Sequence, residues 1–146
     1  MDILLKQYRG LIENESDITA IMSNTSAFIY ENMKNLNWAG FYIMRDGELV
    51  LGPFQGKVAC YRIKLEKGVC GHCATEKKSV IVENVHEFPG HIACDSASNS
   101  ELVVPVLSNG ELFGVIDIDS FEFNNFSEED RSFIEGIADI FAEKLV

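Results

Sequence analysis

The sequence has little positive charge. Its 146 residues include 12 Lys and Arg against 23 Asp and Glu, which leaves a formal net charge of −11 at pH 7. Nucleic acids and anionic membrane surfaces are polyanions and repel such a chain, and no block of basic residues offsets the repulsion. The charge therefore argues against nucleic acid and membranes as partners.

Long apolar runs are missing as well. The longest, such as Leu102 to Leu107, fall far short of the roughly 20 residues of a membrane-spanning helix. Residues 1–6 have neither the basic segment nor the apolar stretch of a signal peptide, so we expect a cytoplasmic protein. Repeats, low-complexity tracts and Gly-rich phosphate loops are also absent. Length and an apolar content of 47% favour one domain, residues 1–146, with its own core.

Cysteine is present at four positions, Cys60, Cys70, Cys73 and Cys94. A disulfide framework is typical of short secreted chains and is a poor interpretation here. Buried inert thiols suit Cys60, which lies between Ala59 and Tyr61, better than Cys94, which lies in a polar stretch. Redox chemistry and metal binding remain open.

The hydrophobic pattern predicts helices at both ends and strands between them. Apolar residues recur at helical spacing over about 2–14, 18–29 and 128–145, and a short helix is expected over 69–77. Residues 36–51 and 101–119 indicate two hairpins, the first turned by Asp46-Gly47, while 52–56 are expected to form a loop. Short strands are expected at 59–65 and 80–82. The order predicts an α+β fold with a central, mainly antiparallel sheet.

Cys70-Gly71-His72-Cys73 resembles the active-site motif of disulfide isomerases. The βαβ context of thioredoxin-like folds is missing, however, so we regard this motif as misleading. Zinc is the other interpretation, but structural zinc sites usually need a second close pair of ligands. The potential ligands are Cys60, Cys70, Cys73, Cys94, His72, His86 and His91.

Three acids form a second candidate group. Side chains alternate along a strand, so Asp117 and Asp119 share one face while Ile116 and Ile118 share the other. Carboxylates on an apolar strand are costly unless they meet a cation, a metal or a shared proton. Together with Glu101, they indicate a functional pocket.

Several motifs together resemble the free methionine-(R)-sulfoxide reductases, which are single GAF domains. The most specific is Gly90-His91-Ile92-Ala93-Cys94-Asp95-Ser96-Ala97-Ser98-Asn99-Ser100-Glu101. The others are Asn37-Trp38-Ala39-Gly40-Phe41-Tyr42, Leu51-Gly52-Pro53-Phe54-Gln55-Gly56-Lys57, Gly68-Val69-Cys70-Gly71 and Gly114-Val115-Ile116-Asp117-Ile118-Asp119-Ser120. The resemblance implies a GAF-like sheet with helices packed on one face.

The resemblance also implies the roles of individual residues. Cys94 is the expected nucleophile, Cys60 the main resolving thiol and Cys70 a secondary one, whereas Cys73 departs from the family pattern. The expected substrate-binding residues are Glu101, Asp117, Asp119 and Trp38, with Tyr42 as a weaker candidate. Backbone N–H groups are expected to hold the substrate carboxylate. For His86 and His91, hydrogen bonds that stabilise their loop are the favoured interpretation, and assistance to the thiolate is the alternative.

The implied reaction reduces free methionine-(R)-sulfoxide through a sulfenic acid and a disulfide that thioredoxin recycles, a task for cells under oxidative stress. It needs no metal or other cofactor, and the family resemblance suggests a homodimer. The alternative from another class is a non-catalytic GAF domain that senses a small ligand or redox state. Such a sensor needs neither Cys60 nor Cys94.

Overall fold

The computed structural model describes residues 2–91 and 97–146, which form one six-stranded sheet and flanking helices. The strand order is β3-β2-β1-β6-β5-β4, and every pairing between described strands is antiparallel. The strands are Leu36–Arg45 (β1), Glu48–Gly56 (β2), Arg62–Lys64 (β3), Val80–Val82 (β4), Ser100–Ser108 (β5) and Glu111–Ser120 (β6). The α-helices of the described ranges are Asp2–Ile12 (α1), Ile18–Asn32 (α2), Gly68–Glu76 (α3) and Glu128–Ala142 (α4), with 3-10 turns at Val85–Glu87 (η1) and Glu143–Leu145 (η2).

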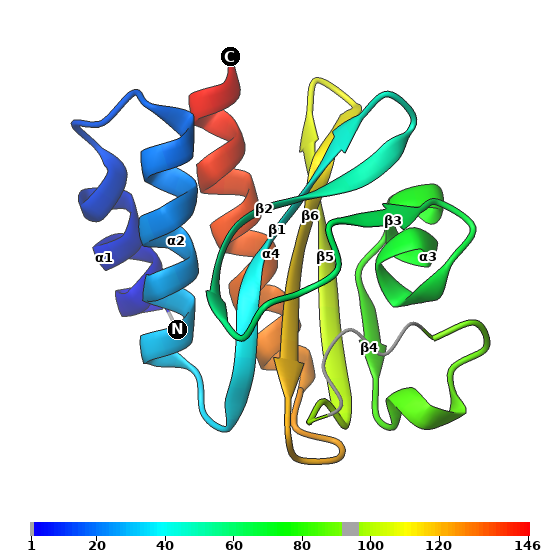
Figure 1. The fold of residues 1–146 in the computed structure, drawn as a ribbon. Helices are drawn as coiled ribbons and strands as arrows, with labels where there is room; N and C mark the ends of the chain where they lie inside the picture. Colours follow the sequence, from blue (N-terminus) through cyan, green and yellow to red (C-terminus); the bar gives the residue numbers. More distant parts are fainter. Residues whose placement is uncertain (1, 92–96) are drawn as a thin grey trace.

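The helices lie on both faces of the sheet (Figure 1). α1, α2 and α4 cover one face, and the short α3 covers part of the other. The α+β class and the antiparallel sheet predicted from the sequence are confirmed, as is the packing of the long helices on one face. α3 departs from the expectation that all helices pack on one face, because it packs on the opposite face. None of the helices in residues 2–91 and 97–146 has the length and apolar character of a membrane span.

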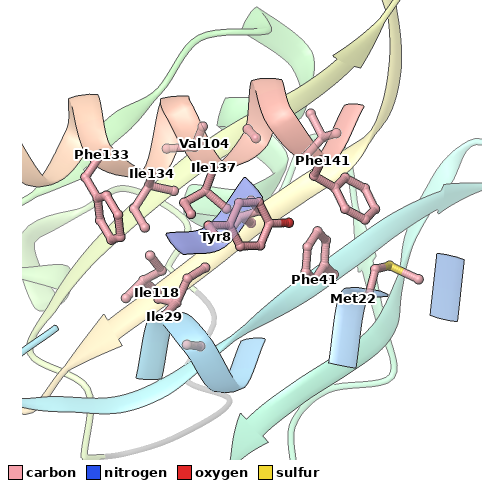
Figure 2. Close-up of a cluster of buried hydrophobic side chains, with 14 of the residues drawn as sticks. Tyr8, Met22, Ile29, Phe41, Val104, Ile118, Phe133, Ile134, Ile137 and Phe141 are labelled. Carbon is pink, nitrogen blue, oxygen red and sulfur yellow. The ribbon is translucent and has the colours of Figure 1, made fainter. Parts of the chain in front are cut away.

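The main hydrophobic core lies between the sheet and the three long helices (Figure 2). Phe41 from β1 packs on Phe141 from α4 with ring centroids 5.1 Å apart, and both rings are fully buried. A smaller apolar cluster lies on the opposite face, between the sheet and α3. The larger cluster therefore supplies most of the packing, whereas the smaller one lies on the face that contains the cavity.

The sequence alternation of β1 sets this separation. Ala39, Phe41 and Ile43 enter the helix-side core, whereas Trp38 and Tyr42 enter the cluster beside α3. Each predicted hairpin turns on an Asp-Gly or Asn-Gly pair with positive φ at both residues, at 46–47 and at 109–110. These are the dihedrals of a type I′ turn, whose twist matches that of the flanking strands.

Two local expectations are wrong. Residues 52–56, expected as a loop, continue β2 to Gly56, because the pairing with β1 shifts between Gly40 and Tyr42 and accommodates one extra residue of β2 as a bulge. Pro53 lies at this irregularity, where a missing backbone donor costs little. The strand expected over 59–65 is confined to Arg62–Lys64, since residues 57–61 leave the sheet and form a connection over the cavity.

Replacing Phe41 with Ala should destabilise the fold by about 3–5 kcal/mol, because it leaves a void against Phe141. Urea denaturation followed by circular dichroism measures the change. Phe123→Ala is the matched control, since this ring is 55% exposed and should change stability by less than about 0.5 kcal/mol. Equal losses in the two variants would contradict the assignment of Phe41 to the core.

Candidate active site

A small cavity of about 40 Å³ lies on the face of the sheet that α3 covers. Strands, α3 and two connections contribute its walls, so it forms only when distant parts of the chain come together. Its volume suits a small molecule, and no macromolecule enters it. The lining residues are Trp38, Tyr42, Ala59, Ile63, Gly68, Val69, Cys70, His91, Ser98, Glu101, Asp117 and Asp119.

The three predicted acids all line this cavity. Asp119 of β6 is paired directly with Glu101 of β5 on one side and with Trp38 of β1 on the other. Directly paired residues carry their Cβ atoms roughly 4.5–5.5 Å apart, so this register forms a row across three strands. Asp117 follows on the same face of β6, opposite Gly40. The alternation predicted for residues 116–119 is therefore confirmed, with Ile116 and Ile118 in the opposite core.

Burial and mutual repulsion make these carboxyl groups hard to ionise. Glu101 and Asp117 are each 6% exposed. Burial, followed by repulsion from Asp117 and Asp119, raises the pKa of Glu101 well above its ordinary value. Burial also raises the pKa of Asp117, although a hydrogen bond from Glu101 opposes this rise. The pair therefore holds a proton on Glu101 more readily than on Asp117.

Asp117 also presents an acceptor that the protein does not use. Its Oδ1 atom is buried and accepts no hydrogen bond from the described residues. Leaving a buried acceptor unsatisfied costs about 1–3 kcal/mol. Because Asp117 lines the cavity, a ligand that donates a hydrogen bond would remove this cost.

Stacked aromatic rings form another wall of the cavity. Trp38 stacks on Tyr42 at a centroid distance of 5.8 Å and on Phe54 at 5.0 Å. Both polar ends are used: Trp38 Nε1 donates to the carbonyl of Lys57 (3.1 Å), and Tyr42 Oη donates to that of Cys60 (2.9 Å). The aromatic wall therefore also holds the connection that carries Cys60.

Helix α3 directs its N-terminal end at the cavity. Gly68, Val69 and Cys70, the first residues of the helix, all line the cavity. The first amides of a helix lack acceptors within the helix, and the N-cap Lys67 provides no side-chain hydrogen bond. The positive end of the helix dipole thus faces the same space as the acids.

Cys70 and Cys73 are free, buried thiols on α3. Cys70 Sγ lies 3.9 Å from Glu101 Oε2, and burial together with the nearby acids raises the pKa of Cys70 well above its ordinary value. These two effects outweigh the helix N-terminus, which by itself would favour a thiolate. Cys73 is fully buried in the smaller apolar cluster, and burial raises its pKa too. Neither thiol has the exposed, thiolate-stabilising environment of a thioredoxin-like motif.

Cys60 has a different environment. It lies half-buried in the connection between β2 and β3 and is disulfide-bonded, unlike Cys70 and Cys73. Ala59, its neighbour, lines the cavity. Cys94, for which the resemblance implies the role of nucleophile, lies outside the described residues.

The two histidines of the middle segment have different surroundings. His86 Nε2 lies 2.8 Å from the side-chain oxygen of Asn99, which fits the loop-stabilising role expected for it. His91 lines the cavity, and burial followed by repulsion from His86 lowers its pKa. A neutral His91 adds no positive charge to a cavity whose other titratable side chains, among the described residues, are three carboxyls, a phenol and a thiol.

The described residues that approach the geometry of a metal site are Cys70, Glu101 and Asp117, whose donor atoms lie within 4.8 Å of one another. Sulfur and carboxylate oxygen are acceptable zinc ligands, but all three would have to lose protons that burial makes hard to remove. This trio differs from the cysteine and histidine set that the sequence suggested.

Sequence reasoning missed several lining residues, namely Ala59, Ile63, Gly68, Val69 and Ser98. Ser98 lies within the most specific motif of the resemblance, and Gly68 and Val69 lie directly before Cys70, so proximity to these motifs was the available signal. Ile63 carried no signal, because its position depends on how β3 pairs with β2.

Comparisons with known proteins agree with this fold. The GAF domain family model matches residues 15–145. A free methionine-R-sulfoxide reductase of Escherichia coli is 48% identical over 88% of this chain and 78% of that protein. One of Saccharomyces cerevisiae is 44% identical over 100% of this chain and 86% of that protein. The X-ray structure of the Neisseria meningitidis enzyme in complex with its substrate superposes with a TM-score of 0.93, at 39% identity and with 97% and 85% of the two chains covered.

The protein is thus a GAF domain protein. Within that family, the chain belongs to the free methionine-R-sulfoxide reductases, which are oxidoreductases acting on a sulfur group.

Replacing Glu101 with Gln should stabilise the fold at neutral pH, because the buried carboxyl is forced to keep a proton that the unfolded chain releases. Above pH 4.5, the ordinary pKa of this side chain, the folded state holds a proton that the unfolded state has lost. The free energy of unfolding of the wild type therefore falls by up to about 1.4 kcal/mol per pH unit. The advantage of the variant should therefore vanish below pH 4.5 and grow as the pH rises.

Urea unfolding between about pH 4 and pH 8 measures this difference. Glu111→Gln is the matched control, since Glu111 is exposed. A stability difference for the Glu101 variant that stays constant over this range would show that the carboxyl is not forced to stay neutral by burial.

Proposed function

We propose that residues 1–146 form one catalytic GAF domain that reduces free L-methionine (R)-S-oxide to L-methionine. The observation that carries the proposal is the row of Trp38, Asp119 and Glu101 beside Asp117, all facing one small cavity. This arrangement matches the two ends of the substrate that distinguish it from other small molecules, its ammonium group and its sulfoxide.

The acids support recognition of the ammonium group. Asp117 Oδ1 is a buried acceptor with no donor among the described residues, and Asp119 lies on the same face of β6. A methionine residue within a peptide has an uncharged amide nitrogen in place of the ammonium and continues on both sides. It offers no charge to these carboxylates, and its flanking chain would have to fit beside a small cavity. The enzyme should therefore select the free amino acid.

The start of α3 supports recognition of the substrate carboxylate. The cavity lining contains no Lys or Arg, so a carboxylate would have to be met by backbone groups. The amides of Gly68, Val69 and Cys70 lie at the positive end of the helix, where anions bind readily. The face of Trp38 provides an apolar surface for the methyl group.

The reaction begins with attack by the Cys94 thiolate on the sulfoxide sulfur. Glu101, which its environment keeps protonated, donates a proton to the sulfoxide oxygen. The oxygen then transfers to the Cys94 sulfur while the S–O bond of the substrate and the new bond between the two sulfurs break, so methionine leaves and Cys94 becomes a sulfenic acid. The sulfur of the substrate gains two electrons and that of Cys94 loses two.

Cys60 then resolves the sulfenic acid. Its thiol attacks Cys94, water leaves, and a disulfide forms between the two residues. Cys60 is disulfide-bonded and lies beside the cavity, which supports this role. The high pKa of the buried Cys70 thiol leaves it a secondary partner at most. Two electrons from a dithiol protein such as thioredoxin return both cysteines to thiols.

Purified protein should consume NADPH when supplied with thioredoxin, thioredoxin reductase and free methionine-(R)-sulfoxide. The S epimer and N-acetyl-methionine-(R)-sulfoxide, which lacks the ammonium charge, are the matched control substrates and should give no turnover. If the free R epimer also gives none, with dithiothreitol as well as with thioredoxin, the protein is not this enzyme.

Cys94→Ser should abolish turnover, because no nucleophile remains. Cys73→Ala should retain it, because Cys73 is buried in the apolar cluster and does not line the cavity. Steady-state rates with dithiothreitol measure both effects, and intact mass should show the wild type losing two hydrogens after one equivalent of substrate. Activity in the Cys94 variant, or loss of activity in Cys73→Ala with an unchanged fold, contradicts these roles.

A non-catalytic GAF sensor of small ligands or redox state is the alternative. It would bind methionine sulfoxide or a related molecule in the same cavity with no change in mass and no methionine formed. Calorimetric binding without turnover is the outcome that would establish the sensor.

A further inference from the structure

The connection between β2 and β3, a green loop in Figure 1, carries two large apolar side chains that are exposed to solvent and close to Cys60 in the sequence. Val58 is 87% exposed and Tyr61 80% exposed, more than any other large hydrophobic side chain in residues 2–91 and 97–146 except the terminal Val146. Single exposed apolar residues are common on protein surfaces. Here two of them flank Cys60 on either side.

The backbone of this connection is held in place. The carbonyls of Lys57, Cys60 and Tyr61 accept hydrogen bonds from Trp38 Nε1 (3.1 Å), Tyr42 Oη (2.9 Å) and the amide of Leu51 (2.9 Å). The exposed side chains of Val58 and Tyr61 are therefore attached to an ordered backbone. A preorganised surface loses less conformational entropy when a partner binds, which favours docking.

Basic residues gather along the same connection and just beyond it. Residues 57–67 contain four of the twelve Lys and Arg residues of the chain and one acid, Glu66. Lys57, Arg62, Lys64 and Lys67 are all exposed, and Arg62 pairs with Glu48 at 3.1 Å. At physiological salt, charges are screened beyond roughly 8 Å, so a docked partner responds to this local positive charge more than to the net charge of −11.

We propose that the 57–67 surface, with Val58 and Tyr61 around Cys60 and the basic residues at its edge, docks the protein that reduces the enzyme. The partner fitted by this chemistry is a small dithiol protein with an apolar, acidic-rimmed active site. This inference rests on the proposed function, because docking at Cys60 is useful only if Cys60 becomes oxidised during turnover.

The exchange that follows docking is a balanced two-electron step. A thiolate of the partner attacks the sulfur of Cys60, a mixed disulfide forms, and Cys94 leaves as a thiolate. The second thiol of the partner then attacks the partner's own sulfur in the mixed disulfide and releases Cys60. The partner is oxidised to its disulfide, and both enzyme cysteines are reduced.

The test compares thioredoxin with dithiothreitol, a small dithiol that needs no docking surface. The variants are Val58→Ser/Tyr61→Ser and Lys64→Glu, and none of these residues lines the cavity. The controls are Ile3→Ser, which removes an apolar side chain 72% exposed on α1, and Lys34→Glu, which reverses an exposed charge elsewhere.

We expect Val58→Ser/Tyr61→Ser and Lys64→Glu each to lower kcat/KM for thioredoxin about tenfold or more, a loss of roughly 1.4 kcal/mol in transition-state stabilisation. The dithiothreitol-driven rate should stay unchanged, as should both rates in the controls. The effect of Lys64→Glu should shrink as salt is raised.

Three results would overturn the docking surface. Equal losses with thioredoxin and dithiothreitol would mean that the variants disturb the cavity, and unchanged thioredoxin kinetics would place docking elsewhere. Dissociation of a homodimer by Val58→Ser/Tyr61→Ser, seen by analytical ultracentrifugation, would assign the surface to a second copy of the chain. Failure of the proposed function is distinct, because the wild type would then show no turnover even with dithiothreitol.

Discussion

Three carboxyl groups crowded on one face of a sheet are the constraint around which the rest of this molecule is arranged. Glu101 and Asp117 are almost completely buried, and Asp117 keeps an acceptor that no described protein group satisfies. Such a cluster opposes folding. The opposite face offsets this cost with a continuous core between the sheet and three helices. Packing and chemistry are thereby assigned to separate faces of the same strands.

The two-residue period of β1 and β6 produces both faces at once. In β6, Ile116 and Ile118 enter the helix-side core, while Asp117 and Asp119 enter the cavity. A shift of one residue in the pairing would move the acids into the apolar core and the isoleucines into the cavity. The register therefore depends on the acids that would bind the ligand as well as on the isoleucines. Packing of the isoleucines in the core holds the acids in the cavity, although burying them there opposes folding.

Local patterns explain which features the sequence could predict. The shared face of Asp117 and Asp119 follows from strand alternation, and the hairpin turns follow from Asp-Gly and Asn-Gly. The course of β2 through Pro53 was missed, because it depends on how one extra residue of β2 is accommodated in the pairing with β1. The alignment of Glu101 with Asp119 and the approach of α3 likewise depend on contacts between residues far apart in the sequence.

The cysteines show why residue type alone does not define a redox site. Cys70 lies in the first turn of a helix, a position that favours a thiolate, yet burial beside carboxyl groups keeps it a thiol. Cys60 lies instead on a connection that Trp38 and Tyr42 hold by hydrogen bonds to its backbone. These two rings also line the cavity. In the proposed mechanism, a substrate that packs on them contacts the anchors of the connection that carries Cys60, so substrate recognition and electron exchange would depend on the same pair of side chains.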